Sequence, residues 1–269
     1  MKETAARPRP LAGKRIVVTR PEGTAAGVLR DALAAQGATV LDIPLIDIEY
    51  TADPAALEDV WSNMGQFDWL VFTSANGVRG FFERFFETFN DIRGIGPARI
   101  ACVGDATTAA VRAHHLNVDF QPEKSTADDL ARELADTEDL AHLRVLVVAG
   151  NKNSDSLAKT LETRGKAIAQ TLIVYAAVEN DIGQLDAAES FRRLGADAIV
   201  FASPSAADSF VAQAKLLAPV KTARHPVAVA IGPSTADALR EHGIPVAAQA
   251  AEPTPAALAA AVAAALSPK

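Results

Sequence analysis

The sequence has few of the residues on which common kinds of functional site depend. Its 269 residues include one cysteine, Cys102, and five histidines whose spacing is untypical of metal ligands. One cysteine excludes an intramolecular disulfide and a cysteine-based zinc site. The chain also lacks a GxxxxGK[ST] loop, a GxGxxG motif and a GxSxG elbow. We therefore expect no metal site, and the sequence shows no nucleotide-binding fingerprint.

Positive charge and long apolar runs are also scarce. The net charge is −7, so the chain lacks the basic footprint of a nucleic-acid-binding protein. The apolar stretch at 256–266 is too short to cross a bilayer, and residues 1–12 lack the apolar core of a secretory signal. We expect a cytoplasmic protein that binds neither nucleic acid nor membrane and has a flexible N-terminus at residues 1–12.

Short apolar runs rich in β-branched residues alternate with helical patterns. The expected strands are 15–19, 69–73, 100–103, 145–148, 198–202 and 227–231. The expected helices include 24–36, 105–115, 127–136, 154–164 and 235–242. Because the strands lack polar alternation, they are typical of strands covered on both faces. The alternation of strands with helices predicts an α/β fold with parallel sheets.

The two halves of the chain resemble each other. LVFTSANGVRGFF at 70–82 matches IVFASPSAADSFV at 199–211, and ACVGDATTAAVRAH at 101–114 matches VAIGPSTADALREH at 229–242. Paired residues 128 or 129 positions apart are Phe72 with Phe201, Ser74 with Ser203, Gly104 with Gly232 and Thr107 with Thr235. This order and spacing predict a tandem duplication that forms two similar α/β domains with a cleft between them.

Two longer segments, 39–51 and 166–180, occupy matching places in the two halves. Each is longer than a typical buried strand of about 5–6 residues, so each is interpreted as an extended connection between the domains. Domain 1 is then discontinuous. The expected bounds are 13–42 with 180–269 for domain 1, 47–172 for domain 2, and connectors near 43–46 and 173–179.

Hydroxyls, amides and glycines follow the expected strands. Ligands of an open parallel sheet bind beyond the carboxyl ends of its strands, where helix N-termini attract anions. For any single loop helix capping is the better explanation, but six such strand ends in two matched sets favour an anionic ligand. The candidate binding residues are Arg20, Thr73, Ser74, Asn76, Gly104, Thr107, Asn151, Lys152, Ser203, Ser205, Gly232, Ser234 and Thr235.

Tyr175 is one of two tyrosines and lies in the second connecting segment. A phenol at the mouth of the expected cleft can donate a proton to a leaving oxygen. The competing interpretation is a half-buried strand tyrosine whose hydroxyl is hydrated. The sequence leaves both interpretations open.

In this order, the segments resemble uroporphyrinogen-III synthase, a cofactor-independent family of tetrapyrrole biosynthesis. The resemblance extends over residues 14–266. Its main segments are IVVTRPEG (16–23), VFTSANGV (71–78), CVGDATTAAV (102–111), LIVY (172–175), VFASPSAADSF (200–210), AIGPSTADAL (230–239) and EPTPAALAAAV (252–262).

The resemblance implies two α/β domains joined by a two-stranded connector. It also implies a lyase that acts on hydroxymethylbilane, a linear tetrapyrrole with eight carboxylates. The family's reaction loses the terminal hydroxyl as water, inverts ring D through a spiro intermediate and closes the macrocycle to uroporphyrinogen III. It further implies a monomer without a cofactor, which receives its substrate by transient handover from hydroxymethylbilane synthase.

Family positions carry over to several residues of this chain. The tyrosine that assists departure of the hydroxyl falls on Tyr175. Residues that match the family's cleft threonines, serines and first-loop arginine are Thr107, Thr235, Ser74, Ser203, Ser205 and Arg20.

The chain also departs from the family pattern. Many bacterial members carry arginines in the loop after the strand at 145–148 and directly after the tyrosine. This chain has Ala149, Ser154 and Ala176 there, with Lys152 as one positive charge in the loop. A catalytically silent tetrapyrrole-binding relative therefore stays an alternative. A two-domain binder of another polycarboxylate or a phosphorylated metabolite is a third.

Overall fold

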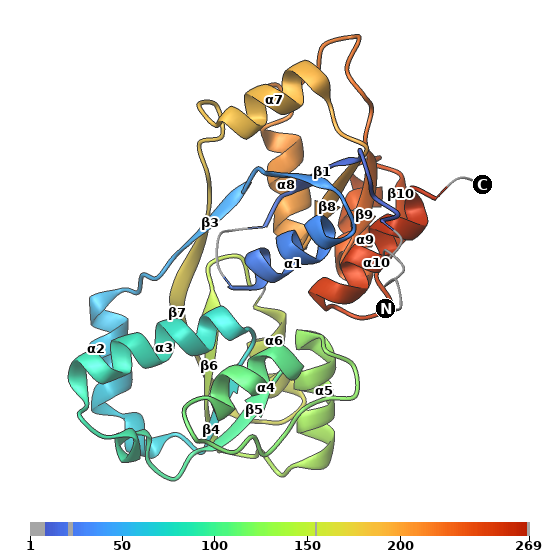
Figure 1. Cartoon of the computed structure of the whole chain (residues 1–269). Coiled ribbons are helices and arrows are strands. Elements are labelled where there is room, and N and C mark those ends of the chain that lie inside the picture. The colour runs from blue at the N-terminus through green and yellow to red at the C-terminus, as the bar shows by residue number, and fades with distance from the viewer. Residues whose placement is uncertain (1–8, 21–23, 154, 268–269) are drawn as a thin grey trace, which may run out of the picture. The chain divides into compact units, whose positions relative to one another are not determined.

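The computed structural model describes residues 9–20, 24–153 and 155–267. The chain forms two compact units (Figure 1). Unit 1 comprises Met1–Asp47 and Val178–Lys269, and unit 2 comprises Ile48–Ala177. Unit 1 is thus built from both ends of the chain, and unit 2 from its middle.

Each unit contains a five-stranded sheet. Unit 1 has the order β10-β9-β8-β1-β2, in which every neighbouring pair is parallel. Its strands are β1 (Arg15–Val18), β2 (Thr39–Asp42), β8 (Ala198–Phe201), β9 (Val227–Ala230) and β10 (Val246–Gln249). Unit 2 has the order β3-β7-β6-β4-β5, with parallel pairs from β7 to β5. Its strands are β3 (Ile46–Glu49), β4 (Trp69–Phe72), β5 (Arg99–Cys102), β6 (Arg144–Gly150) and β7 (Ile168–Glu179). The expected α/β fold with parallel sheets is confirmed.

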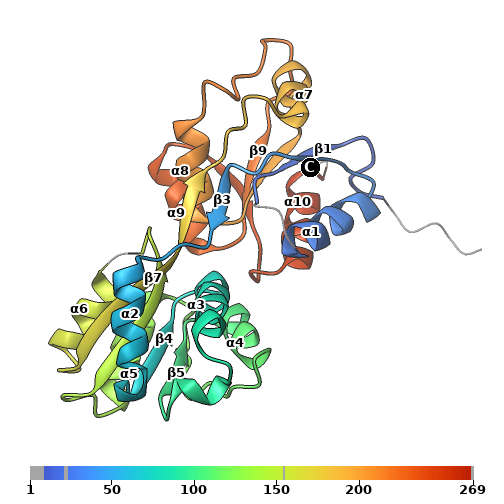
Figure 2. The same ribbon diagram turned by 90° about the vertical axis from the view of Figure 1, so that its left-hand side faces the viewer.

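Helices cover both faces of each sheet. In Figure 2, α1 and α10 lie on one side of the unit 1 sheet and α8 and α9 on the other. The helices of unit 1 are α1 (Thr24–Ala35), α7 (Asp186–Leu194), α8 (Pro204–Ala212), α9 (Pro233–Glu241) and α10 (Pro255–Ala265). Those of unit 2 are α2 (Pro54–Ser62), α3 (Ala75–Thr88), α4 (Asp105–Arg112), α5 (Ala127–Thr137) and α6 (Ser156–Thr163). No helix of the described residues has both the length and the hydropathy that crossing a bilayer requires.

The central strands are buried on both faces, as their unbroken apolar runs predict. In β4, Leu70 and Phe72 pack into the apolar cluster that includes Phe81 of α3. Trp69 and Val71 face the opposite cluster, which includes Leu134 of α5. Alternate residues therefore supply two separate cores, one on each side of the sheet.

The same backbone clamp recurs in both sheets. Asp197 Oδ2 accepts a hydrogen bond from the Arg15 N–H at 2.8 Å and so joins the starts of β8 and β1. In unit 2, Asp68 Oδ2 accepts from the Arg144 N–H, also at 2.8 Å, and joins the starts of β4 and β6. Both aspartates precede a buried strand by one residue.

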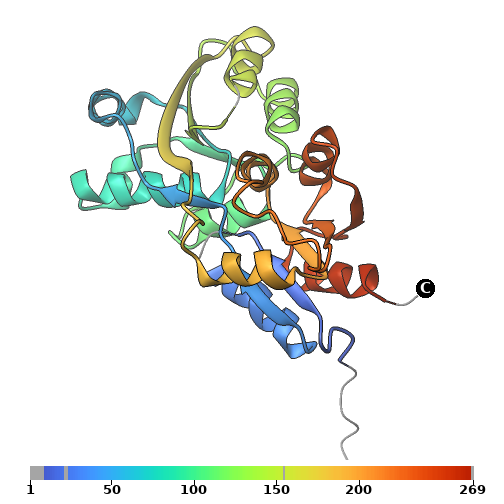
Figure 3. The same ribbon diagram turned by 90° about the horizontal axis from the view of Figure 1, so that it is seen from above.

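The two expected connecting segments differ from each other. Residues 39–51 contain two short strands, β2 in the sheet of unit 1 and β3 in that of unit 2. Residues 166–180 contain one twelve-residue strand, β7, the curved dark-yellow ribbon of Figure 3. The Leu45 carbonyl oxygen accepts hydrogen bonds from the Asn180 N–H at 3.0 Å and the Ser209 hydroxyl at 3.0 Å, which ties both chain segments to unit 1.

Some expected bounds are wrong. The flexible N-terminus is expected at 1–12, and its residues 1–8 lie outside the described part. Leu11, however, is fully buried, and its N–H donates to the Gln36 carbonyl at 3.0 Å. The expected helix 105–115 ends at Arg112, because His115 adopts a left-handed conformation with φ 61°. The expected helix 154–164 begins at Ser156, and Ser154 itself lies outside the described residues.

Candidate active site

Except for Tyr175, which lies within β7, the expected site residues follow the carboxyl ends of strands in both sheets. Those of unit 2 are Thr73, Ser74, Asn76, Gly104, Thr107, Asn151, Lys152 and Tyr175. Those of unit 1 are Arg20, Ser203, Ser205, Gly232, Ser234 and Thr235.

The contact between Tyr175 and Ser74 is the central feature of the unit 2 group. Ser74 is the N-cap of α3, and its Oγ accepts a hydrogen bond from the Gly77 N–H at 3.0 Å. The same hydroxyl donates to the Tyr175 phenol oxygen at 3.1 Å. A helix cap thus joins a phenol contributed by β7 to the start of α3.

A slip in strand register brings Tyr175 to this position. Ala149 pairs with Ile173, but the next residue, Gly150, pairs with Tyr175. Val174 is therefore an extra residue on β7, and strict alternation along the strand is broken at this point. Tyr175 packs on the same apolar cluster as Val174, whereas Ile173 packs on the opposite one. The slip directs the phenol to the face that α3 covers.

Gly150 makes room for the phenol ring. A Cβ on Gly150 would lie 2.3 Å from Cζ and 2.8 Å from the hydroxyl oxygen of Tyr175. No other residue type therefore fits beside the ring in its present position. The backbone of Gly150 is not in the left-handed region, so the steric requirement comes from the ring and not from φ.

Other polar groups at the ends of β6 and β4 also form hydrogen bonds, most of them with the backbone. The Asn151 N–H donates to the Tyr175 carbonyl at 3.0 Å, and Asn151 Oδ1 accepts from the Ala177 N–H at 2.9 Å. The Thr73 hydroxyl donates to the Val148 carbonyl at 3.2 Å. Asn76 Oδ1 accepts from the Tyr50 hydroxyl at 3.4 Å. Asn151 and Lys152 are both exposed, so they have freedom to contact a ligand.

Glycines and threonines begin the next helix of each unit. Gly104 caps α4 and Gly232 caps α9, both in extended conformations. Thr107 and Thr235, three residues further on, are buried. Among the residues that the structure describes, Gly104, Thr107 and Lys152 make no hydrogen bond to the Tyr175–Ser74 pair.

The unit 1 group contains a helix cap and a cation. Ser203 caps α8, and its Oγ accepts from the Ala206 N–H at 3.2 Å. Ser205 is half-buried and Ser234 is exposed. Burial lowers the pKa of the half-buried Arg20 guanidinium. Within the described residues no carboxylate forms an ion pair with Arg20.

Metal and thiol chemistry have no candidate residues in the described part of the chain. Within residues 9–20, 24–153 and 155–267, no three His, Cys, Asp or Glu side chains gather into a metal-ligand group. Cys102 lies fully buried in β5, and burial raises the pKa of its thiol to about 12. The interpretation of Cys102 as a small buried hydrophobe is confirmed.

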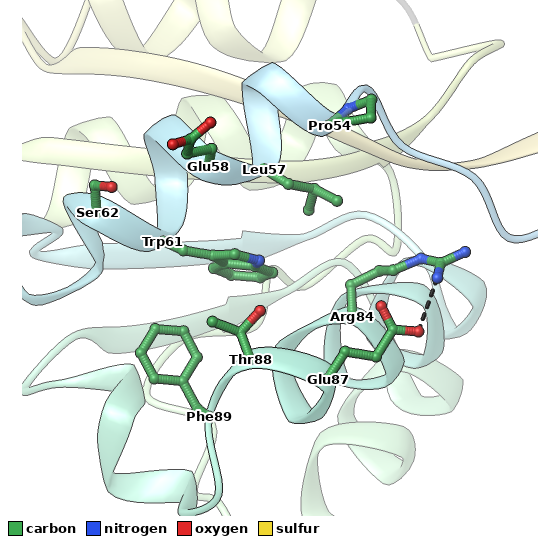
Figure 4. A pocket seen from close by; sticks show the side chains of 9 residues that line it. All are labelled: Pro54, Leu57, Glu58, Trp61, Ser62, Arg84, Glu87, Thr88 and Phe89. Atoms are coloured by element: carbon green, nitrogen blue, oxygen red, sulfur yellow. Dashed lines mark hydrogen bonds and ion pairs between the residues drawn. The ribbon is translucent and has the colours of Figure 1, made fainter.

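A groove of about 540 Å³ lies away from these residues, between α2 and α3 (Figure 4). Its lining includes the Trp61 indole, Phe89 and the ion pair of Arg84 with Glu87. None of the expected site residues lines it. The strand ends, and not this groove, carry the candidate chemistry.

Sequence reasoning missed one part of the site, because it did not assign a role to Gly150, which accommodates the phenol. It also did not predict the contact of Tyr50 with Asn76. It also treated Ser74 and Tyr175 as separate candidates. The signal for Gly150 is weak, because a glycine at the end of a strand is common and only the register of β6 against β7 places the ring over it.

A family model and several known proteins resemble this chain. The model of the family "Uroporphyrinogen-III synthase HemD" matches residues 27–260. Over 88% of this chain, the porphyrin biosynthesis protein HemD of Ruminiclostridium josui is 26% identical, and the match covers 45% of that protein. The uroporphyrinogen-III synthase of Synechococcus elongatus is 27% identical over 60% of each chain. The chain therefore matches about half the length of these two relatives.

Solved structures share the fold. A mutant uroporphyrinogen III synthase from Thermus thermophilus is 21% identical, with a TM-score of 0.67 over 94% of this chain and 99% of that one. The uroporphyrinogen-III synthetase of Helicobacter pylori is 19% identical, with a TM-score of 0.58 over 91% and 96%. Because the family model matches most of its length, this chain belongs to the uroporphyrinogen-III synthase family.

Proposed function

We propose that this chain is an active uroporphyrinogen-III synthase, a lyase that cyclises hydroxymethylbilane with loss of water and inversion of ring D. The observation that carries the proposal is the Tyr175 phenol, held at 3.1 Å by the Ser74 hydroxyl beside the carboxyl ends of the unit 2 strands. Family membership supplies the substrate class.

In the proposed first step, the Tyr175 O–H gives its proton to the terminal hydroxyl of the bilane. The C–O bond breaks, its electron pair goes to oxygen, and water leaves. A cationic methylene carbon and a Tyr175 phenolate remain. The substituted α-carbon of ring D then bonds to that methylene carbon and forms the spiro intermediate. The bond from the same ring carbon to its original methylene bridge breaks, and the released, cationic bridge carbon bonds to the free α-carbon of ring D. That α-carbon loses the proton that restores the phenol. The proton balance closes without an oxidant or a reductant.

Catalysis also depends on substrate conformation, because the free bilane closes to the wrong isomer. The proposal assigns carboxylates of the substrate to the strand ends of both units. Backbone N–H groups at the starts of α3, α4, α8 and α9 bind them, with hydroxyls such as those of Ser205 and Ser234 and the charges of Arg20 and Lys152. Holding one conformer is a positioning effect.

The proposal includes the architecture expected from the sequence: a tandem duplication whose domains are joined by a two-stranded connector. Two observations support it. Central strands in the order β2-β1-β8-β9 correspond to β7-β6-β4-β5. The Asp197–Arg15 and Asp68–Arg144 clamps recur at equal length and at a constant sequence offset. We also propose a cytoplasmic monomer that receives its substrate from hydroxymethylbilane synthase.

The test is incubation of the purified protein with hydroxymethylbilane, followed by chromatographic separation of the type I and type III isomers after oxidation. The expected product is type III, formed faster than spontaneous closure. Product of type I alone would overturn the proposal. Tight binding of uroporphyrinogen with no acceleration would instead favour the catalytically silent relative, because this chain has Ala149 in β6 and Ala176 in β7 where many family members have arginine.

A further inference from the structure

We infer that Ser74 is the positioning residue of Tyr175, and that it acts on the reaction through the phenol and not as a ligand of a substrate carboxylate. The inference rests on the proposed function for the role of the phenol. Its structural part, a phenol fixed between a helix cap and a glycine, rests on unit 2 alone.

The hydrogen bonds of Ser74 set the direction of the phenol proton. Ser74 Oγ accepts the Gly77 N–H and uses its own proton for the Tyr175 oxygen. The phenol oxygen is then an acceptor toward Ser74, which leaves its own O–H free to donate away from α3. When Tyr175 gives up its proton, the same Ser74 O–H stabilises the phenolate. Ser74 thus favours both the orientation and the product of the proton transfer.

Gly150 completes the restraint on the ring. Because a Cβ there would lie 2.3 Å from Cζ, the ring rests against the backbone of β6. Its inner edge packs on the apolar cluster that contains Val78 and Val174. The ring is therefore held on two sides by apolar and backbone atoms, and only its hydroxyl depends on a polar partner.

Helix capping alone does not account for this arrangement. Ser203 makes the same cap at the start of α8, with its Oγ 3.2 Å from the Ala206 nitrogen. Unit 1, however, has no tyrosine, since both tyrosines of the chain lie in unit 2. The additional hydrogen bond to a phenol is thus specific to Ser74.

A double-mutant cycle tests whether Ser74 acts through Tyr175. Ser74→Ala should lower kcat roughly 10- to 100-fold, the range for one hydrogen bond to a developing charge, with KM nearly unchanged. Ser74→Thr, which keeps a hydroxyl, should restore most of the rate. In a Tyr175→Phe background, Ser74→Ala should have less than about a twofold further effect. Equal losses in both backgrounds, or a loss confined to KM, would overturn the inference.

The matched control is Thr126→Ala. Thr126 caps α5 in the same unit, and its Oγ accepts from the Asp129 N–H at 3.0 Å without contacting Tyr175. This variant loses a helix cap just as Ser74→Ala does, so it should share the loss of thermal stability. We expect it to keep its kcat.

A spectroscopic measurement tests the contact independently of activity. Protein labelled with ¹³Cζ-tyrosine gives two resonances, because the chain has two tyrosines, and Tyr50→Phe assigns the one from Tyr175. That resonance should shift in Ser74→Ala and stay in place in Thr126→Ala and Ser74→Thr. An unmoved resonance in Ser74→Ala would overturn the inference. If the wild-type protein makes no type III product, the proposed function is overturned instead. The resonance then tests only whether Ser74 contacts Tyr175.

Discussion

In both units, the helix after a central strand begins at a serine whose Oγ caps the N–H three residues further on, Ser74 before α3 and Ser203 before α8. The strands that precede them, β4 and β8, have equal lengths and start after the equivalent aspartates Asp68 and Asp197. Only Ser74 also contacts a phenol. The similar scaffold therefore positions helix starts in both units, whereas the proposed proton donor, Tyr175, belongs to unit 2.

Composition separates the two units as well. Both tryptophans, both tyrosines and eight of the eleven phenylalanines lie in unit 2. Among them, Trp61 packs edge to face on Phe81 and on Phe85, with ring centroids 5.3 and 5.8 Å apart. Unit 2 has 12 basic and 19 acidic side chains, whereas unit 1 has 14 of each. The whole net charge of −7 thus lies in the unit that carries Tyr175.

Among the substitutions that test this difference between the units, replacing the Tyr175 phenol should have the largest effect. Tyr175→Phe should lower kcat by roughly 10²- to 10⁴-fold, as expected for the loss of a general acid. Tyr50→Phe is the matched control, because it removes the other tyrosine of unit 2 and should change the rate only a few-fold. Steady-state kinetics with circular dichroism of both variants measures this. Similar losses in both would contradict a specific role for Tyr175.

Adding a methyl group at Gly150 tests the steric part of the site. Gly150→Ala should displace the ring of Tyr175 and lower kcat roughly 10-fold or more, since overpacking at a close contact costs about 1–3 kcal/mol. Gly27→Ala in α1 of unit 1 is the control: its Cβ meets nothing within 4 Å, and the helix should gain about 0.5–1 kcal/mol. The two changes should therefore shift stability in opposite directions. Full activity of Gly150→Ala would contradict the proposed packing.

The two aspartate clamps differ in their surroundings. Burial alone would raise the pKa of Asp197, but hydrogen bonds from the Arg15 N–H and Arg224, with the nearby charge of Lys14, hold this pKa below its usual value. Asp68 is more exposed and accepts from the Arg144 N–H. Asp197→Ala should therefore destabilise unit 1 by about 2–3 kcal/mol, and Asp68→Ala should destabilise unit 2 by about 1 kcal/mol.

Urea unfolding followed by two signals separates these effects. Tryptophan fluorescence reports on unit 2 alone, whereas circular dichroism reports on both units. Because the pKa of Asp197 is lowered on folding, its stabilisation is present above the usual carboxyl pKa of about 3.9 and is lost as the pH falls below it. The wild type and Asp197→Ala should therefore converge in stability at low pH. If the difference in stability between the wild type and Asp197→Ala is unchanged at a pH of about 2, the proposed stabilisation by the Asp197 carboxylate is contradicted.

The smallest expected effect belongs to His114, which stacks on Phe82 with ring centroids 4.1 Å apart. Burial, and then the charge of His115, lower the pKa of His114. Because the unfolded chain binds this proton more readily, unit 2 should lose stability, by less than about 1 kcal/mol, as the pH falls through about 6.5. His114→Phe should flatten that part of the pH profile of tryptophan-detected unfolding. If the pH profile of His114→Phe is identical to that of the wild type, His114 does not cause this loss of stability.

The central strands could be predicted because their chemistry is local. Runs such as LVF at 70–72 and IVF at 199–201 are apolar on both faces, and the structure places them in the middle of parallel sheets. The burial of Cys102 follows from the same pattern. Leu11 could not be predicted, because the four residues before it are arginines and prolines and its burial depends on the core between α1 and α10.

The site was predicted as a set of residues but not as a set of contacts. Strict alternation along β7 sends Tyr175 and Val174 to opposite faces, and only the register slip at Gly150 brings the phenol toward Ser74. Likewise, residues 39–51 read as one extended segment, because the sequence does not reveal that β2 and β3 pair in different sheets. Both outcomes depend on pairing between strands distant in sequence.

The isomer composition of the product that the wild-type chain forms from hydroxymethylbilane tests the central claim most directly. We predict type III in large excess over type I, formed faster than spontaneous closure, with the excess rate falling sharply in Tyr175→Phe. Type I product at the rate of the enzyme-free reaction would contradict the claim.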